Sequence, residues 1–241
     1  MRLIKLLHKW LSVLVALQLL IWLGSGLFFN LMDHNKARGN EYRIKSVESL
    51  VMEHDKLLEP SFILNQQLRP VNSVKQIQLL GKPYYLLNHN KGLYPHFYNE
   101  HSLVNAYTGK GKVIDNDMAQ ALAKSSYSGE GVISSSAKVS LPIADFPKEQ
   151  NTVWQVNFAD RLNTSVYLDA SSGRLVGHSN DDKRFADFFF MLHFMDYGFS
   201  GANDGFNNWQ IIFFALLTLL FCMTGLIWTL ELLMKGRYKV R

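Results

Sequence analysis

The amino-acid sequence predicts an α+β protein in which a domain of helices and antiparallel strands is held by two membrane-spanning helices. Residues 10–32 and 209–230 are apolar runs without a charged residue. Each run is longer than the roughly 20 residues that a helix needs to cross about 30 Å of hydrocarbon. Between the runs, short apolar segments are separated by Gly, Asn and Asp, a pattern typical of strands joined by turns. The chain is therefore expected to carry one folded domain on one side of a membrane.

The charges that flank the two runs predict the orientation of the chain. Arg2, Lys5 and Lys9 precede the first run, and positions 235, 237, 239 and 241 after the second run are all basic. Short basic flanks remain in the cytoplasm, whereas a long loop crosses whatever its charge. In a bacterium both termini are then expected in the cytoplasm, the two helices in the inner membrane and residues 33–208 in the periplasm. The first run exceeds the roughly 7–15 apolar residues of a cleaved signal peptide, so we expect it to remain as an anchor.

The distribution of charge argues against nucleic acid as a partner. The chain has a formal net charge of +5, but residues 33–208 hold 18 basic and 19 acidic side chains. The positive charge therefore belongs to the tails, which are expected to contact anionic membrane lipid. The single cysteine, Cys222, lies inside the second run, which excludes an internal disulfide and a cysteine-based zinc site.

The segment between the anchors predicts two helices and six strands. Ser46 can cap a helix that runs to about residue 58, where Pro60 stops it, and a second helix is expected at 117–125. Residues 126–150 are rich in Ser, Gly and Pro and are expected to form a long surface loop. The expected strands are 75–80, 84–88, 93–98, 103–107, 153–159 and 164–169.

A five-residue pattern occurs twice between the anchors. Residues 105–109 read NAYTG and residues 169–173 read DASSG, and a basic residue follows each. An Asn or Asp side chain can bond the backbone two residues further on, and Gly supplies a positive φ. Both segments are therefore expected to be turns at the end of a strand. The repeat predicts two related modules of helix plus antiparallel sheet, at about 45–110 and 115–178.

Four short motifs resemble a known family. Residues 165–176, SVYLDASSGRLV, match the strand and turn pattern of PepSY domains. The first anchor, with LHKWL at 7–11 and SGL at 25–27, resembles that of PepSY-associated transmembrane proteins, as does the Leu-His pair at 192–193. The resemblance covers nearly the whole chain, in a short form with two membrane helices where many relatives have four. It implies a domain without catalytic activity that binds or regulates a membrane or periplasmic protein partner, such as a peptidase.

The resemblance also implies an alternative, because larger PepSY transmembrane proteins are thought to hold haem b through membrane histidines. His8 and His193 are the candidate ligands in this chain, and imidazole is a good axial ligand for iron. His8 is expected at the inner end of the first helix and His193 on the outer side, separated by most of the roughly 30 Å of bilayer. One chain is then not expected to hold haem with this pair, whereas a homodimer could use either histidine with its symmetry mate.

Small and weakly polar residues mark the faces by which the two membrane helices can pack. Ser12 and Gly26 lie on such a stripe of the first helix, and Thr218 and Gly225 lie on one of the second. We expect these stripes to face each other, with Phe221 on a different face. The stripes also include Val15, Leu19, Trp22, Cys222 and Thr229.

Residues 185–199 form an aromatic segment that is too short to span a bilayer, and we expect it to lie in the outer membrane interface. The sequence then divides into a basic tail, a first membrane helix, a PepSY-like domain, an interfacial helix, a second membrane helix and a second basic tail. Their expected bounds are 1–9, 10–32, 33–184, 185–199, 209–233 and 234–241.

No motif of a hydrolase, a nucleotide-binding protein or a cysteine metal site occurs, so we expect no enzymatic activity. His89, His96 and His101 are seven and five residues apart, which suits neither one face of a helix nor a tight strand pair. No metal site is therefore expected. Two hypotheses follow, a tethered binding or regulatory protein without a cofactor and a haem-binding accessory of iron or siderophore reduction. A visible absorption spectrum would distinguish them.

Overall fold

The structure is a computed structural model that describes residues 2–44, 56–195 and 209–236. The chain forms two compact units. Unit 1 contains the residues up to Met32 and the described residues from Ala186 onward, and unit 2 is Asp33–Phe185. The helix predicted at 46–58 falls mainly on residues outside the described ranges. Its last two residues are not helical, so the predicted helix does not extend to residue 58, and Pro60 is the first residue of a short helix, α3 (Pro60–Asn65).

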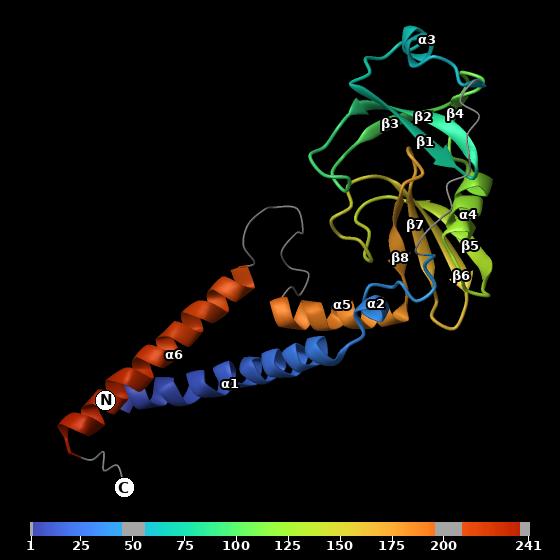
Figure 1. The fold of residues 1–241 in the computed structure, drawn as a ribbon. Helices are drawn as coiled ribbons and strands as arrows, with labels where there is room; N and C mark the ends of the chain where they lie inside the picture. Colours follow the sequence, from blue (N-terminus) through green and yellow to red (C-terminus); the bar gives the residue numbers. More distant parts are fainter. Residues whose placement is uncertain (1, 45–55, 196–208, 237–241) are drawn as a thin grey trace. The chain divides into compact units, whose positions relative to one another are not determined.

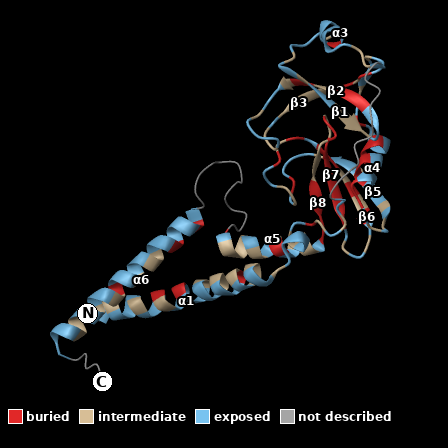
Figure 2. Ribbon diagram, viewed as in Figure 1, coloured by how far each residue is buried: buried red, intermediate tan, exposed pale blue. Residues whose placement is uncertain are grey.

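Unit 1 is built on two long apolar helices, α1 (Arg2–Leu31) and α6 (Trp209–Met234), which pack against each other (Figure 1). With a rise of about 1.5 Å per residue, each helix exceeds the roughly 30 Å of a hydrocarbon core. Most of their apolar side chains are exposed in the isolated chain (Figure 2), as lipid-facing residues are. Both helices are thus long and apolar enough to cross a membrane, which is consistent with a two-pass membrane protein.

Helix α5 (Asp181–Phe194) contains residues 185–194 of the aromatic segment that the sequence predicts at 185–199, and residues 196–199 lie outside the described residues. It begins four residues earlier than expected because the Asn180 side chain accepts a hydrogen bond from the backbone N–H of Lys183, at 2.9 Å. Within unit 1, Phe189 of α5 stacks on Phe28 of α1, with ring centroids 4.0 Å apart. The aromatic face of α5 is therefore partly covered by α1.

Unit 2 contains two antiparallel four-stranded sheets, each with its strands in chain order. This confirms the predicted mixture of helices and antiparallel sheet, and the two sheets have the same strand order. The first sheet consists of β1 (Ser73–Leu79), β2 (Lys82–Asn90), β3 (Glu100–Asn105) and β4 (Gly111–Lys112). The second consists of β5 (Val132–Val139), β6 (Val153–Ala159), β7 (Ser165–Asp169) and β8 (Leu175–Ser179). Unit 2 also contains helices α2 (His34–Ala37), α3 and α4 (Asn116–Ser125) and the first residues of α5.

The strands β4 and β8 and the short helices α2 and α3 were not predicted, and two further segments of unit 2 differ from the sequence-based expectation. Residues 93–98, expected as a strand, form a loop that side-chain amides hold in place. Residues 126–150, expected as a surface loop, contain the edge strand β5. Most residues of β5 are exposed, so its serine-rich sequence lacks the apolar alternation of a strand with one buried face.

The two repeated pentapeptides form equivalent turns, as predicted. The Asn105 Oδ1 accepts from the backbone N–H groups of Tyr107 and Thr108, both at 3.0 Å. Asp169 Oδ1 accepts in the same way from the two residues that follow Ala170, both at 2.9 Å. Gly109 and Gly173 close the turns with φ near +71°, a conformation that glycine adopts without strain. Each turn reverses the chain into the last strand of its sheet.

The main hydrophobic core lies between the two sheets and is completed by α4. Asp115 caps this helix, since its Oδ1 accepts from the backbone N–H of Met118 at 2.9 Å. The indole of Trp154 donates to the carbonyl oxygen of Ile114, so a buried polar group of the core is satisfied. The core residues come from both sheets and from α4, and they include Tyr84, Leu103, Met118, Leu122, Trp154, Val156, Val166 and Leu168. This shared core fixes one sheet against the other.

Candidate ligand-binding site

A cavity of about 580 Å³ lies beside the shared core, and we call it the inter-sheet cavity. Its walls are one face of β1 and β2, the loop at 91–99 and the β7–β8 turn at 172–175. Because successive side chains of a strand point to opposite faces, Lys75, Ile77 and Leu79 line it together. The volume falls within the range of roughly 300–1,000 Å³ that is typical of ligand pockets.

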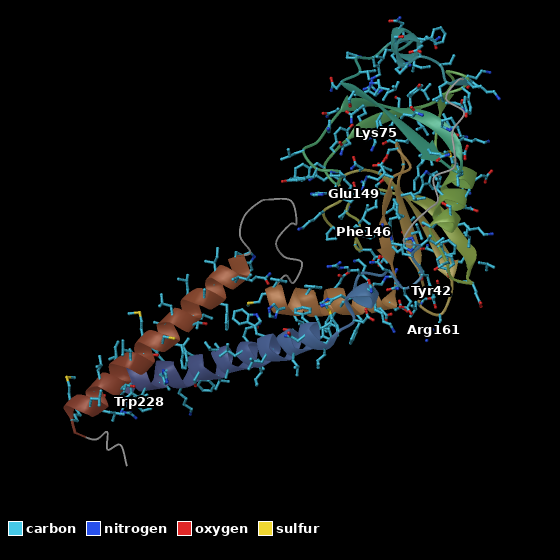
Figure 3. The ribbon with its side chains drawn as sticks, viewed as in Figure 1. Tyr42, Lys75, Phe146, Glu149, Arg161 and Trp228 are labelled. Atoms are coloured by element: carbon cyan, nitrogen blue, oxygen red, sulfur yellow. The ribbon has the colours of Figure 1, made fainter. Side chains whose placement is uncertain are left out.

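Arg174 marks the boundary between this cavity and a second cavity of about 440 Å³, and it lines both. Its Nη2 donates to Oε2 of Glu149 at 2.7 Å and lies 3.9 Å from Oδ2 of Asp169. The Glu149 side chain is only 2% exposed. A charge-assisted hydrogen bond to a buried carboxylate therefore holds the guanidinium in place. Figure 3 shows Lys75, Glu149 and Phe146, which belong to the walls and supports of the two cavities.

Two asparagines hold the 91–99 loop over the inter-sheet cavity. The Asn151 Nδ2 donates to the carbonyl oxygen of Phe97 at 2.7 Å, and its Oδ1 accepts from the backbone N–H of Asn99 at 2.7 Å. The Asn99 side chain in turn accepts from the backbone N–H of Gly92 at 3.1 Å. Asn151 also donates to Glu149, so the carboxylate that holds Arg174 also supports the loop. One buried network thus positions two walls of the cavity.

A line of polar side chains leads from the cavity wall to the β7–β8 turn. Ser171 Oγ donates to Asp169 Oδ1, so it can accept from His101 Nδ1, which lies 3.3 Å away. His101 Nε2 is then free to accept from Asn88 Nδ2, at 3.2 Å. Burial lowers the pKa of His101 against the opposing effect of Asp169, which favours the neutral ring that this arrangement requires. Asn88 Oδ1 remains a buried acceptor without a donor among the described residues.

The geometry of this site suits binding better than catalysis. His101 is engaged through both ring nitrogens, and Arg174 is held by a carboxylate. The three histidines that were considered as metal ligands have separate partners, because His89 bonds Ser102 and the carbonyl oxygen of Pro70, whereas His96 stacks on a tyrosine. Within the described ranges, no group of three or more His, Cys, Asp or Glu side chains could hold a metal ion.

Among the residues that line the inter-sheet cavity, the sequence drew attention only to His101, which was considered as a metal ligand, and to the second turn motif with Arg174, the basic residue that follows it. Glu149 lies inside the loop that the sequence predicts at 126–150, and Asn151 directly follows that loop. Lys75 and Asn88 belong to strands in which no motif marks a functional residue. They meet only because the two sheets pack together.

The two candidate haem ligands each lie against a hydroxyl and a glycine in unit 1. His8 Nδ1 is 3.1 Å from Thr224 Oγ1, and the ring stacks on Phe221. His193 Nδ1 is 2.9 Å from Ser25 Oγ. His8 and Ser25 are 17 residues apart on α1, a rise of about 25 Å. Because two axial ligands must flank one iron closely, these residues do not fit a haem held by both histidines of one chain.

The seam between α1 and α6 differs in part from the predicted stripes. Gly225 lies against His8, and Gly26 lies near His193, so histidine rings occupy the space beside both glycines. Ser12 and Thr218 are half-buried and donate to carbonyl oxygens of their own helices. Leu19, Cys222 and Thr229 are exposed, and Phe221 lies in the seam, so these parts of the prediction are wrong. Helical projection does not account for large rings that insert between the helices.

Replacing Gly225 with leucine is expected to separate the two helices at this point. A Cβ atom at position 225 would lie 3.0 Å from the ring of His8, and a larger side chain would overlap it. Overpacking of this kind costs about 1–3 kcal/mol. The measurement is the yield of a disulfide between Val15→Cys and Phe214→Cys, two residues of one cluster, in a Cys222→Ser background. Ala215→Leu, on an exposed face, is the control and should leave the yield unchanged.

Comparison of the chain with protein-family models gives no match, and comparisons with curated proteins and with solved structures give none either.

Proposed function

We propose that this chain is a membrane-anchored binding protein of the PepSY type, which regulates a partner and has no catalytic activity of its own. The single observation that carries the proposal is the inter-sheet cavity, whose walls are positioned by the buried network of Arg174, Glu149 and Asn151. Buried polar residues that hold a cavity open without presenting a reactive group are expected of a binding site. The two membrane-length helices and the paired turns support the anchored, two-module architecture.

A regulatory role is supported by the segment at 145–149, which contacts both the cavity and the start of α5. Glu149, at one end, holds Arg174, and Asp145, at the other end, accepts from Arg184 Nη2 at 3.2 Å. The backbone carbonyl of Asp145 also accepts from Lys183 Nζ at 2.8 Å. Helix α5 continues covalently from these residues into unit 1. Movement of Arg174 on ligand binding could therefore be passed to α5 through one short segment.

Photo-cross-linking in living cells tests the proposed function. A benzoylphenylalanine is placed at Leu93, which lines the cavity and is 79% exposed, or at Leu68, which is fully exposed and lines neither cavity. We expect an adduct of defined mass from position 93 and none from position 68. Adducts of equal yield at both positions, or none at position 93, would contradict a binding site at this cavity.

The proposed orientation places both termini in the cytoplasm and unit 2 in the periplasm, because the basic tails flank the two helices. Single cysteines, Leu68→Cys or Arg241→Cys in a Cys222→Ser background, are exposed to a membrane-impermeant maleimide on intact spheroplasts. Leu68→Cys should be labelled at once, and Arg241→Cys only after lysis. Labelling of Arg241→Cys in intact spheroplasts would place the C-terminus outside the cytoplasm and contradict this orientation.

The haem alternative receives no support from the geometry of one chain, since His8 and His193 lie near opposite ends of α1. It would need two copies of the chain, each supplying the same histidine. A Soret band that His8→Ala or His193→Ala removes from the purified protein would reinstate it.

A further inference from the structure

We propose that the inter-sheet cavity and its neighbour bind an extended acidic peptide segment, with an apolar side chain in each cavity and a carboxylate facing the lysines of the larger one. This inference rests on the proposed function and adds the chemical class of the ligand.

The wall of the larger cavity is positively charged. Lys75, Lys91 and Arg174 line it, and none of the described residues in its wall is an Asp or Glu. Arg174 is already paired with Glu149, but Lys75 and Lys91 form no ion pair within the described part of the chain. Two unpaired cations beside a cavity attract an anionic group. The preferred ligand therefore carries at least one carboxylate.

The same wall also has an apolar part. Ile77, Leu79 and Leu86 from the first sheet face the cavity together with Leu93 of the loop and Leu175 of β8. An anion without an apolar body would leave this surface in contact with water. A side chain the size of leucine or phenylalanine would bury this surface, and burial of apolar surface favours binding.

The second cavity, which Arg174 also lines, distinguishes a peptide from a simple fatty acid. Pro95, Phe146, Pro147 and Val176 give it apolar walls, and Asp145, Lys148 and Glu149 also line it. Two cavities with apolar walls that share one cation suit a chain whose apolar side chains flank a polar backbone and whose carboxylate lies in the larger cavity. The remaining guanidinium N–H groups of Arg174 can donate to a backbone carbonyl, and Asn88 offers an acceptor for a backbone N–H. A fatty acid has one tail and no such donor.

Peptide binding to the full chain in lipid nanodiscs tests the proposal by fluorescence anisotropy. The probes are fluorescein-labelled hexapeptides with the central triplet Leu-Asp-Phe, Leu-Asn-Phe, Leu-Lys-Phe or Ser-Asp-Ser, each also with the triplet reversed. We expect Leu-Asp-Phe, in one of the two orders, to bind about fivefold to tenfold more tightly than its Asn and Ser counterparts. In the Lys75→Glu, Lys91→Glu double variant, the preference should change from the Asp peptide to the Lys peptide.

A matched control tests whether the change in preference depends on the positions of the two lysines and not on the net charge of the chain. Lys110→Glu with Lys124→Glu makes the same change of charge at exposed positions outside both cavities and should leave the preference unaltered. Equal affinity for the four triplets, or a preference unchanged by Lys75→Glu, Lys91→Glu, would overturn the proposal. Displacement of the Asp peptide by decanoate at equal concentration would also overturn it and would assign a fatty acid. If the Leu93 adduct forms in cells but no peptide is selected, the binding function stands and only the peptide assignment fails.

Discussion

Replacing Glu149 with alanine is expected to lower the free energy of unfolding of unit 2 by about 3 kcal/mol, because the change breaks a buried charged network from its centre. The Glu149 side chain is 2% exposed and accepts from Arg174 Nη2 and from the backbone and side chain of Asn151. Removing it leaves a guanidinium that is only one-third exposed without its carboxylate. It also leaves Asn151 with a lost acceptor, which weakens the support of the 91–99 loop. A buried group left without its partner costs more than the bond itself contributed.

The measurement is pulse proteolysis of the full chain in detergent across a urea series, read as the midpoint of unit 2 unfolding. Glu149→Gln keeps the shape of the side chain and one acceptor oxygen, so its free energy of unfolding should lie between those of Glu149→Ala and the unchanged protein. Glu130→Ala removes a carboxylate from an exposed position and should stay within about 0.5 kcal/mol of the unchanged protein. A Glu149→Ala midpoint equal to that of Glu130→Ala would show that the network contributes nothing to stability.

Acidification is expected to remove up to about 3 kcal/mol of stability from unit 2 through His178 alone. The ring is 1% exposed, and Ser126 Oγ, 3.0 Å from Nε2, donates its own proton to the carbonyl oxygen of Ala123. Nε2 therefore carries the proton and donates to Ser126, and Nδ1 is a buried acceptor without a partner in the described ranges. Burial, together with the nearby charge of Arg43, lowers the pKa of His178 from 6.5 to about 4.

Because the pKa of His178 is lower in the folded state than in the unfolded state, acid destabilises unit 2. The folded state prefers the neutral ring, so the stabilisation is complete above pH 6.5 and is lost as the pH falls from 6.5 through about 4. Urea midpoints measured at pH 7, 5.5 and 4.5 should decrease steadily in the unchanged protein. His178→Phe keeps a ring in the same volume but cannot take up a proton, so its midpoint should depend less on pH over this range. Parallel curves for the two proteins would show that another group controls the acid response.

Much of the fold could be predicted because its signals are local. The apolar runs, the strand at 153–159 and helix α4 follow from hydropathy and periodicity within a few residues of one another. The turns at 105–109 and 169–173 follow from the chemistry of an Asx side chain and a glycine four residues later. The residues that determine each of these features lie within one short stretch of sequence.

The candidate site could not be predicted in this way, because its contacts join residues that are far apart in the chain. Glu149 meets Arg174 across 25 residues, and His101 meets Ser171 across 70. The contact of His8 with Thr224 in unit 1 is of the same kind, since it joins residues 216 positions apart. The edge strand β5 could not be predicted for the same reason, since most of it is exposed and its pairing with β6 defines it. By itself, the sequence determined the two membrane-length helices, the alternation of strands and turns, and the absence of a catalytic motif. Only the tertiary structure decided which polar side chains share a cavity, because that depends on how two sheets pack and on no short-range pattern.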